Sequence, residues 1–271
     1  MPGRPSGFVY RLPPEAKRVF GTMLAAIRAF YAHSFWHYPE ADTRYGLGYV
    51  LSYSGRTWLS GANQLWIDVP GQVNAALLDD AVRFFRPYQA EWSVFTLPKA
   101  QPGLQERLLH LGAYTRWSSP LMLLDGPPAR VRPLPPVTVQ AVQGEALRRA
   151  AHRIIAEAFH MHPEVSPRMV RAEDEADSEI HHAIALVDGI PAGVASLSLK
   201  GQIASIWNVG TRRRFRRRGV AYALMHDLLE KAQLAQCPRS ILLASSMGRP
   251  LYETLGYQTI AQVYYMGVAA H

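Results

Sequence analysis

A proline-rich segment near the middle of the chain places the strongest limit on how this sequence can fold. Residues 126–136 read Gly-Pro-Pro-Ala-Arg-Val-Arg-Pro-Leu-Pro-Pro, with five prolines. Proline fixes φ and lacks a backbone N–H, so the segment cannot be a helix and suits an extended, semi-rigid linker. A chain of 271 residues has the length of two ordinary domains. We therefore expect an N-terminal domain over 1–126, a linker over 127–136 and a C-terminal domain over 137–271.

The composition is that of a folded protein with a buried core. Hydrophobic residues make up 48% of the chain and charged residues 18%. No apolar run is long enough to span a bilayer, and the N-terminus lacks the apolar stretch of a signal peptide, so we expect no membrane association and a cytoplasmic location. The single cysteine, Cys237, agrees with a reducing compartment. The net charge of +8 favours an anionic partner, such as a nucleotide, nucleic acid or acidic lipid.

The spacing of apolar residues predicts alternating helices and strands in both halves. In the first half it predicts helices starting near Pro14 and over 75–85 and 104–111, and strands over 47–53, 65–69 and 92–97. In the second half it predicts strands over 137–142, 183–187, 191–199, 203–209, 241–244 and 258–268, and helices over 147–158, 221–232 and 250–255. This order is typical of a mixed α/β layered domain.

The segment over 209–221 carries the clearest chemical signal. It reads Val-Gly-Thr-Arg-Arg-Arg-Phe-Arg-Arg-Arg-Gly-Val-Ala and leads from a strand into an amphipathic helix. A tight strand-to-helix turn exposes backbone N–H groups at the positive end of the helix dipole, which favours an anion. Gly219 allows close approach to a phosphate group, and the arginines add charge-assisted hydrogen bonds. The predicted ligand group is a pyrophosphate.

This segment resembles the acyl-coenzyme A signature of the GNAT superfamily of N-acetyltransferases, Arg/Gln-x-x-Gly-x-Gly/Ala, as Arg216-x-x-Gly219-x-Ala221. About thirty residues later, residues 244–257 read Ala-Ser-Ser-Met-Gly-Arg-Pro-Leu-Tyr-Glu-Thr-Leu-Gly-Tyr, which resembles the family's second motif. The resemblance covers about residues 137–271. It implies two tandem GNAT-like α/β (α+β) domains, each a mixed, mostly antiparallel twisted sheet flanked by helices, with splayed central strands in the C-terminal one.

The resemblance also implies roles for particular residues. The backbone of Val209, Gly210 and Thr211 would pair with the pantetheine amides of acetyl-CoA, the co-substrate. Ser245 would face the pantetheine arm, and Tyr252 would protonate the departing thiolate. The pyrophosphate would be held by the main-chain N–H groups of Arg216, Arg217, Arg218, Gly219, Val220 and Ala221.

One position departs from the family pattern. Many relatives carry a glutamate on the fourth strand that deprotonates the amine, and this chain has Ser205 there. Candidates for the base are His181, His182 and the acidic run over 173–179, and an amine that arrives already neutral is a further alternative. The sequence selects none of them. The acidic run is otherwise interpreted as a solvated face, or as a means of attracting a cationic amine. No metal site is predicted, because His160 and His162 have no third ligand at suitable spacing.

The N-terminal half resembles a degenerate copy of the same fold. Leu111-Gly112-Ala113 precedes a strand that reaches Met122, and Leu255-Gly256-Tyr257 precedes a strand that reaches Met266 at the same spacing. The first half lacks both the arginine–glycine turn and the Leu-Tyr-Glu sequence, so we do not expect it to bind coenzyme A. Its expected role is to wall the acceptor pocket or to support the other half.

The leading functional hypothesis is an N-acyltransferase that moves an acetyl group from acetyl-CoA to an amine by direct attack in a ternary complex. The acceptor is expected to be a small-molecule or peptide amine, and the sequence does not identify it. The first alternative is a non-catalytic, regulatory coenzyme A-binding protein, which Ser205 favours. The second is a basic nucleic-acid-binding module, which the arginines alone would suggest but which the accompanying motifs disfavour. The oligomeric state is not readable from the sequence.

Overall fold

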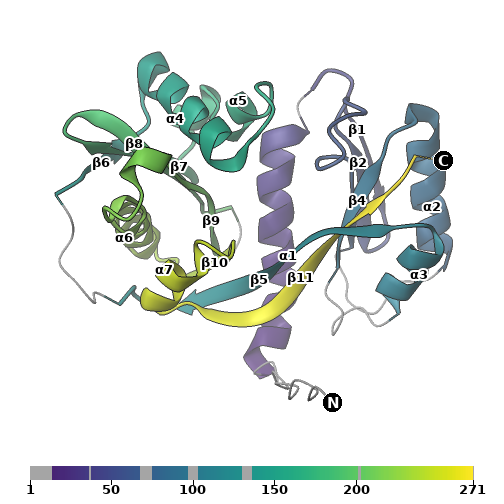
Figure 1. The fold of residues 1–271 in the computed structure, drawn as a ribbon. Coiled ribbons are helices and arrows are strands. Elements are labelled where there is room, and N and C mark those ends of the chain that lie inside the picture. The colour runs from purple at the N-terminus through teal and green to yellow at the C-terminus, as the bar shows by residue number, and fades with distance from the viewer. Residues whose placement is uncertain are drawn as a thin grey trace, which may run out of the picture.

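The computed structural model describes residues 14–36, 38–67, 75–96, 103–129, 136–200 and 203–270. In these ranges the strands form a single eleven-stranded sheet in the order β1-β2-β3-β4-β11-β5-β10-β9-β8-β7-β6 (Figure 1). Neighbouring strands are antiparallel except for two parallel pairs, β3 with β4 and β9 with β10. Helices cover both faces of the sheet. This confirms the expected mixed, mostly antiparallel α/β architecture.

The N-terminal half contains the elements that the apolar spacing predicts, together with one further strand. That strand, Asp42–Gly46, was not predicted, because its side chains are polar or exposed and carry no apolar alternation. The elements are α1 (Pro14–Phe35), β1 (Asp42–Gly46), β2 (Tyr49–Tyr53), β3 (Gln64–Ile67), α2 (Ala75–Phe85), a 3-10 turn (Arg86–Tyr88), β4 (Trp92–Thr96), α3 (Leu104–His110) and β5 (Tyr114–Asp125).

The C-terminal half repeats this order and adds a strand and short helical elements. Its predicted strands and helices are all present, with ends that differ by a few residues. The elements are β6 (Thr138–Ala141), α4 (Gly144–Phe159), α5 (Ser166–Met169), the 3-10 turn η2 (Glu173–Ala176), β7 (Ile180–Val187), β8 (Ile190–Ser198), β9 (Ala204–Thr211), the 3-10 turn η3 (Arg213–Phe215), α6 (Val220–Leu234), β10 (Arg239–Leu243), α7 (Arg249–Thr254) and β11 (Gln258–Val268).

The two halves exchange their last strands. Strand β5, the last of the N-terminal half, pairs with β10 along Leu121–Asp125, whereas β11 crosses over and pairs with β4. The two exchanged strands also pair with each other in an antiparallel arrangement, so the sheet runs without a break from one half to the other. Figure 1 shows β11 carrying the C-terminal end of the chain towards α2. The predicted boundaries, 1–126 and 137–271, lie between elements of the sequence, but each half gives its last strand to a pairing with the other half. The division into two domains stays a prediction.

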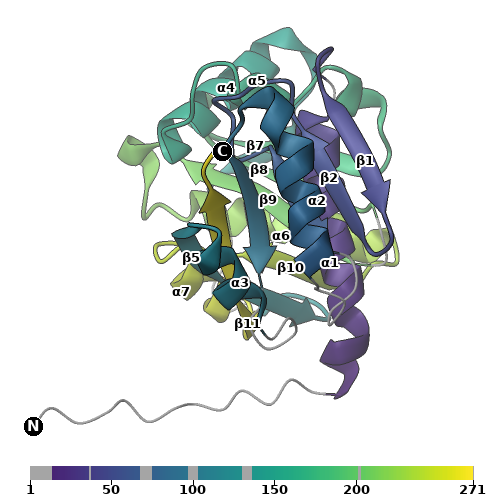
Figure 2. The same cartoon turned by 90° about the vertical axis from the view of Figure 1, so that its right-hand side faces the viewer.

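Helix α1 lies between the two halves and contributes to both cores (Figure 1). Its Met23 and Ile27 pack with Val50 and Trp66 of the N-terminal sheet, while Phe30 joins the cluster beneath α4. On the opposite face of the N-terminal half, α2 and α3 cover β2 to β4, as Figure 2 shows from that side. In the C-terminal half, α6 and α7 share a core with β7 to β10. Burial of this apolar surface is the main stabilising contribution to such layers.

Two sequence predictions can be compared with the structure only within the described residues. The central part of the proline-rich linker, 130–135, lies outside them. Within the described ranges, no helix has the length and apolar character to cross a bilayer.

Candidate active site

The first turn of α6 forms an anion cradle. Gly219 precedes the helix with φ 78°, and Arg217 also adopts a left-handed conformation, with φ 60°. These two left-handed residues turn the chain around the N-terminal end of the helix. Because the first amides of an α-helix have no acceptor within the helix, those of Val220 and Ala221 are directed out of its end. An anion placed there gains these hydrogen bonds and the favourable end of the helix dipole.

The arginine-rich loop is anchored to α4 by a residue that the sequence analysis did not single out. The Glu157 carboxylate accepts hydrogen bonds from the Arg213 backbone N–H at 3.1 Å and from Arg212 Nε at 3.0 Å. Burial opposes the charged form of Glu157, but these two bonds outweigh it and lower its pKa. Phe215 is buried beneath the loop. The loop is therefore held in place on both sides.

The remaining arginines of the loop surround the cradle with positive charge. Arg216, Arg217 and Arg218 are exposed, and Arg216 Nε donates to the Thr211 carbonyl at 3.3 Å. Arg218 lies 4.0 Å from the Asp188 carboxylate, an exposed pair that contributes little to stability. Guanidinium groups have a hydrogen-bond geometry that matches a diphosphate well.

Two glycines bring the surrounding elements close to the cradle. A Cβ on Gly193 of β8 would lie 2.5 Å from Val220 Cγ1, so the start of α6 sits directly against the strand. A Cβ on Gly210 of β9 would lie 3.0 Å from Ala158 Cβ, at the end of α4. Glycine at both positions lets α4 and α6 pack tightly against the strands that approach the cradle.

Strands β9 and β10 separate on their way to the cradle. They pair only at their start, where Ser240 lies opposite Ala204 and Ile241 opposite Ser205. Beyond Ser205, in the residues that the structure describes, β9 has a strand partner on its β8 side alone. The edge that faces the gap is thus available to pair with an extended ligand. Val209 and Thr211 are half-buried along this edge, and Gly210 is buried.

A β-bulge interrupts β9 just before this open edge. Between the pairs Ser196 with Trp207 and Val194 with Gly210, β9 has one residue more than β8. Asn208 takes up the extra length in a left-handed conformation, with φ 57°, and its Nδ2 donates to Ser196 Oγ at 3.2 Å. A bulge changes the direction of the neighbouring backbone amides and often lies beside an active site. Here it turns the backbone near Val209 at the mouth of the gap.

Tyr252 of α7 reaches the same region from the other side of the gap. Its side chain is buried, with 6% of the residue exposed. It belongs to the same hydrophobic cluster as Val220 and Ala244, and Val209 packs against that cluster. Burial raises the pKa of the Tyr252 phenol to about 12, so the group keeps its proton at neutral pH. A Cβ on Gly248 would lie 2.9 Å from the Tyr252 ring, so the glycine makes room for it.

Ser245 has a structural role beside this tyrosine. It is exposed, and its Oγ accepts a hydrogen bond from the Gly248 N–H at 3.1 Å, at the start of α7. Its carbonyl also accepts the Arg249 N–H at 2.9 Å. Ser245 therefore stabilises the turn that leads into the helix that carries Tyr252, and its expected contact with a pantetheine arm stays a prediction.

Comparison with known proteins agrees with this geometry. Residues 148–257 match the model of the acetyltransferase (GNAT) family. The matched segment contains the cradle, the separating strands and Tyr252. Residues 148–257 form a GNAT acetyltransferase domain.

Solved structures extend the similarity to the fold of the whole chain. A GCN5-related N-acetyltransferase from Kribbella flavida is similar with a TM-score of 0.73 and 18% identity, covering 92% of this chain and 95% of that one. A tandem GNAT protein from the clavulanic acid biosynthesis pathway has a TM-score of 0.61 and 15% identity, covering 95% of this chain and 96% of that one. These likenesses support a tandem GNAT fold. A search of curated proteins gave no match.

The GNAT domain has no accessible base at the position of Ser205. Ser205 is 1% exposed, and its Oγ accepts a hydrogen bond from Trp207 Nε1 at 2.8 Å. The Trp207 ring is itself stacked on Phe30 of α1, with ring centres 4.0 Å apart and planes 5° from parallel. The helix of the other half thus covers the strand at this point, and Ser205 is a structural residue.

A buried polar network lies on the face of the sheet that α1 covers. It contains residues among which the sequence could not select a base. The Asp174 side chain is fully buried and accepts hydrogen bonds from His182 Nε2 at 2.9 Å and from His33 Nε2 at 2.8 Å. The Arg171 backbone N–H donates to it at 2.8 Å. Burial alone would raise the pKa of this carboxyl, but the hydrogen bonds from His182, His33 and Arg171 outweigh burial and hold the pKa well below its usual range.

The network changes the interpretation of the acidic run over 173–179. Glu175 is exposed, as expected for a solvated segment, whereas Asp174 is enclosed and joins α1 of the N-terminal half to β7 of the GNAT domain. No group of three or more potential metal ligands gathers within the described residues.

Proposed function

We propose that the protein transfers an acetyl group from acetyl-CoA to the nitrogen of a small-molecule or peptide amine, by direct attack in a ternary complex. The observation that carries the proposal is the combination of an anion cradle at Gly219 with an unpaired strand edge that leads away from it. A diphosphate joined to an extended chain of amides, which is the chemistry of coenzyme A, matches both features.

In this proposal the co-substrate is held mainly by main-chain groups. The N–H groups over 216–221 bind the diphosphate, aided by the arginine side chains. The pantetheine amides pair with the open edge of β9 at Val209, Gly210 and Thr211, as an additional strand would. Ser245 lies beside the pantetheine arm. The thioester then lies near the bulge at Asn208, where a redirected backbone N–H stabilises the negative charge that develops on the carbonyl oxygen.

The transfer requires two proton movements. The amine nitrogen attacks the thioester carbon, the C–N bond forms, the C–S bond breaks, and the thiolate takes the Tyr252 proton. A phenol that burial keeps protonated is suited to this role, because it can donate as charge develops on the sulfur. The amine must also lose a proton, and Ser205 is not placed to receive it.

Calorimetric titration with acetyl-CoA tests the binding step. Gly219→Trp should abolish the binding heat, because the side chain fills the cradle and the residue requires a left-handed conformation. Arg216→Ala should weaken binding by about 10-fold, in line with the loss of one charge-assisted contact. Absence of binding by the parent protein would refute the proposal.

A panel of amines tests the chemistry and the acceptor class. Release of the coenzyme A thiol is followed with amino acids, polyamines, aminoglycosides, peptide N-termini and lysine peptides as acceptors. Thiol release above the rate of acetyl-CoA hydrolysis identifies an acceptor. Binding without turnover for any amine would favour a regulatory coenzyme A-binding protein instead. Salt-sensitive nucleic-acid binding without acetyl-CoA binding would point to the basic binding module.

A further inference from the structure

The GNAT domain needs a proton acceptor, and the structure closes the position where the sequence pattern places one. Ser205 is buried, and its hydroxyl is hydrogen-bonded to Trp207, whose ring stacks on Phe30. A base for the amine must therefore reach the bulge of β9 from another direction. The side chain that contacts the bulge is Ser196 of β8, through Asn208.

A continuous hydrogen-bonded chain leads from the bulge to a histidine and a carboxylate. Asn208 Nδ2 donates to Ser196 Oγ at 3.2 Å, and Ser196 Oγ lies 2.8 Å from His182 Nδ1. The opposite ring nitrogen of His182, Nε2, lies 2.9 Å from Asp174 Oδ2. Ser196 is 3% exposed and the His182 side chain 7%, so these bonds are shielded from competing water.

The chemistry of the chain fixes the direction in which it can carry a proton. The pKa of Asp174 is held well below its usual range, so its carboxylate accepts hydrogen bonds only. His182 Nε2 must then carry the hydrogen that faces Asp174, which leaves Nδ1 of the neutral ring as an acceptor. Asn208 occupies a lone pair of Ser196 Oγ, so the Ser196 hydroxyl directs its own hydrogen towards His182 Nδ1. The arrangement is that of a hydroxyl activated by a histidine and a buried carboxylate.

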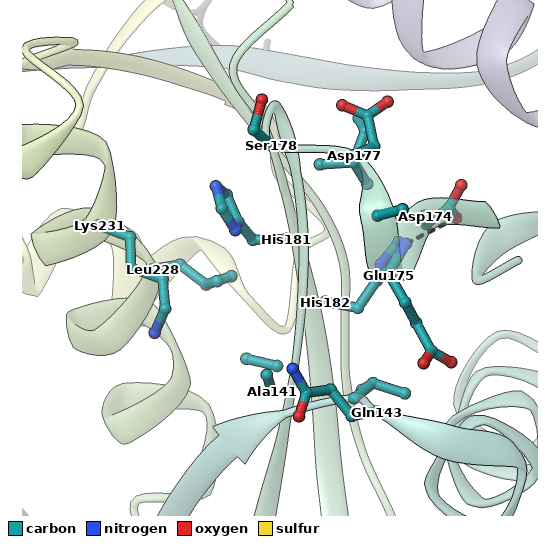
Figure 3. A pocket seen from close by; sticks show the side chains of 14 residues that line it. Ala141, Gln143, Asp174, Glu175, Asp177, Ser178, His181, His182, Leu228 and Lys231 are labelled. Carbon is teal, nitrogen blue, oxygen red and sulfur yellow. Dashed lines mark hydrogen bonds and ion pairs between the residues drawn. The ribbon is translucent and has the colours of Figure 1, made fainter. Parts of the chain in front are cut away.

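A cavity borders this hydrogen-bonded chain on the other side. Its volume is about 250 Å³, and it lies at the start of β7, with Asp174 and His182 in its wall (Figure 3). Gln143, Glu175 and Ser178 also line it and are exposed, so the cavity opens at the surface. Figure 3 shows that His181 points away from His182, towards Leu228 and Lys231 of α6. The other charged or titratable groups around the His182 ring are His33, Arg171 and His152.

We propose that Ser196, His182 and Asp174 form the proton relay for acetyl transfer, which rests on the acetyl transfer proposed above. As the amine attacks, its nitrogen gives a proton to the Ser196 hydroxyl, directly or through one water. Ser196 passes its own hydrogen to His182 Nδ1, and Asp174 stabilises the resulting imidazolium. After the products leave, Nδ1 of the imidazolium returns its proton through the Ser196 hydroxyl to water that enters the emptied site, which restores the Nε2–H tautomer. Tyr252 gives its proton to the thiolate and is reprotonated from solvent, so the balance is amine plus acetyl-CoA to amide plus coenzyme A.

The protonation state of His182 can be tested without an acceptor. Nitrogen-15 NMR of histidine-labelled protein at pH 8 distinguishes the two neutral tautomers, and His182→Gln identifies the signals of that ring. We expect the Nε2–H tautomer, with a change in the Nδ1 signal in Ser196→Ala because its hydrogen-bond donor is removed. A Nδ1–H tautomer would overturn the relay, since that nitrogen could not accept the Ser196 proton.

Kinetics with the best amine of the panel test the role in turnover. His182→Gln and Ser196→Ala should each lower kcat by about 100-fold or more, with the KM for acetyl-CoA within about threefold. The pH profiles of the parent protein and of His182→Gln are both measured with the same amine, whose own protonation lowers the rate at acid pH in every variant. Added imidazole should restore part of the activity of His182→Ala through the cavity. The matched control is His181→Gln, in which rate and pH profile should stay within about twofold of the parent.

The outcomes separate this inference from the proposed function. If the parent protein releases thiol but Ser196→Ala and His182→Gln leave kcat unchanged, the relay is wrong and acetyl transfer stands. Ser196→Ala removes a single oxygen and decides the matter if the His182 variants do not fold. An acetyl group found on Ser196 by mass spectrometry after mixing with acetyl-CoA alone would replace the relay with an acyl-enzyme. A parent protein that neither binds nor consumes acetyl-CoA refutes both proposals together.

Discussion

The contact between Gly193 and the first turn of α6 provides a sharp test of the cradle. Gly193→Ala places a Cβ 2.5 Å from Val220 Cγ1, 3.0 Å from the Gly210 carbonyl oxygen and 3.2 Å from Leu224 Cδ1. Non-bonded carbon atoms rest at about 3.5–4.0 Å, so the start of α6 has to move by about 1 Å. Overpacking of this kind costs about 1–3 kcal/mol in the free energy of unfolding.

The same movement displaces the amides at Gly219 and Val220 that are proposed to bind the diphosphate. A misplacement of about 1 Å at an active site typically lowers the reaction rate by about 100-fold. For binding, we expect the Kd for acetyl-CoA to rise by about 10- to 100-fold. Titration calorimetry measures this Kd, and a thermal unfolding curve measures the loss of stability. The double variant with Val220→Ala removes the closest clashing methyl group and should recover part of the affinity.

Gly21→Ala is the matched control, because among the residues that the structure describes no atom outside its own helix turn lies within 4 Å of the added Cβ. It replaces glycine within α1, so it should stabilise the protein by up to about 1 kcal/mol and leave the Kd unchanged. If Gly193→Ala binds acetyl-CoA as tightly as the parent protein, the placement of the cradle against β8 is refuted.

Three further predictions follow from the site and from the strand exchange. Tyr252→Phe should lower kcat by about 10- to 100-fold in steady-state assays and leave the KM for acetyl-CoA and the Tm nearly unchanged. An unchanged kcat would show that the phenol takes no part in the mechanism. Asp174→Asn should lower the free energy of unfolding at pH 7 by about 3–5 kcal/mol, because it leaves the mostly buried Arg171 guanidinium, 3.2 Å from this carboxylate, uncompensated and removes a charged acceptor from two histidines. Since the pKa of Asp174 is lowered from 3.8, its contribution is complete above that pH and is lost as the pH falls further, so urea titrations should show the two proteins converging below pH 4. Residues 137–271 expressed alone should not give a dispersed NMR spectrum, because β10 and β11 lose β5, whereas co-expression with residues 1–129 should restore a folded complex.

The sequence alone determined the parts of the site that are local in the chain. The turn before α6 depends on consecutive residues, on a glycine that must adopt a left-handed conformation, and on an apolar helical repeat, so each part leaves a pattern that can be read without the fold. The same holds for α7, where Tyr252 and the Leu-Gly-Tyr ending lie within one short segment. Most strands and helices of both halves were predicted because their apolar spacing is regular. Strand β1 was missed because its exposed residues show no such spacing, and the four-residue helix α5 was missed because it is too short to show a repeat.

Only the tertiary structure decided which distant residues meet. The exchange of β5 and β11 depends on pairing between segments more than a hundred residues apart, which leaves no local pattern. Asp174 lies in an acidic run that is typical of a solvated segment, yet α1 and β7 enclose it and supply two histidine partners. Ser205 loses access to the site because Phe30, from the other half of the chain, stacks on Trp207. Burial and charge compensation depend on what packs against a residue, and the sequence around that residue does not contain this information.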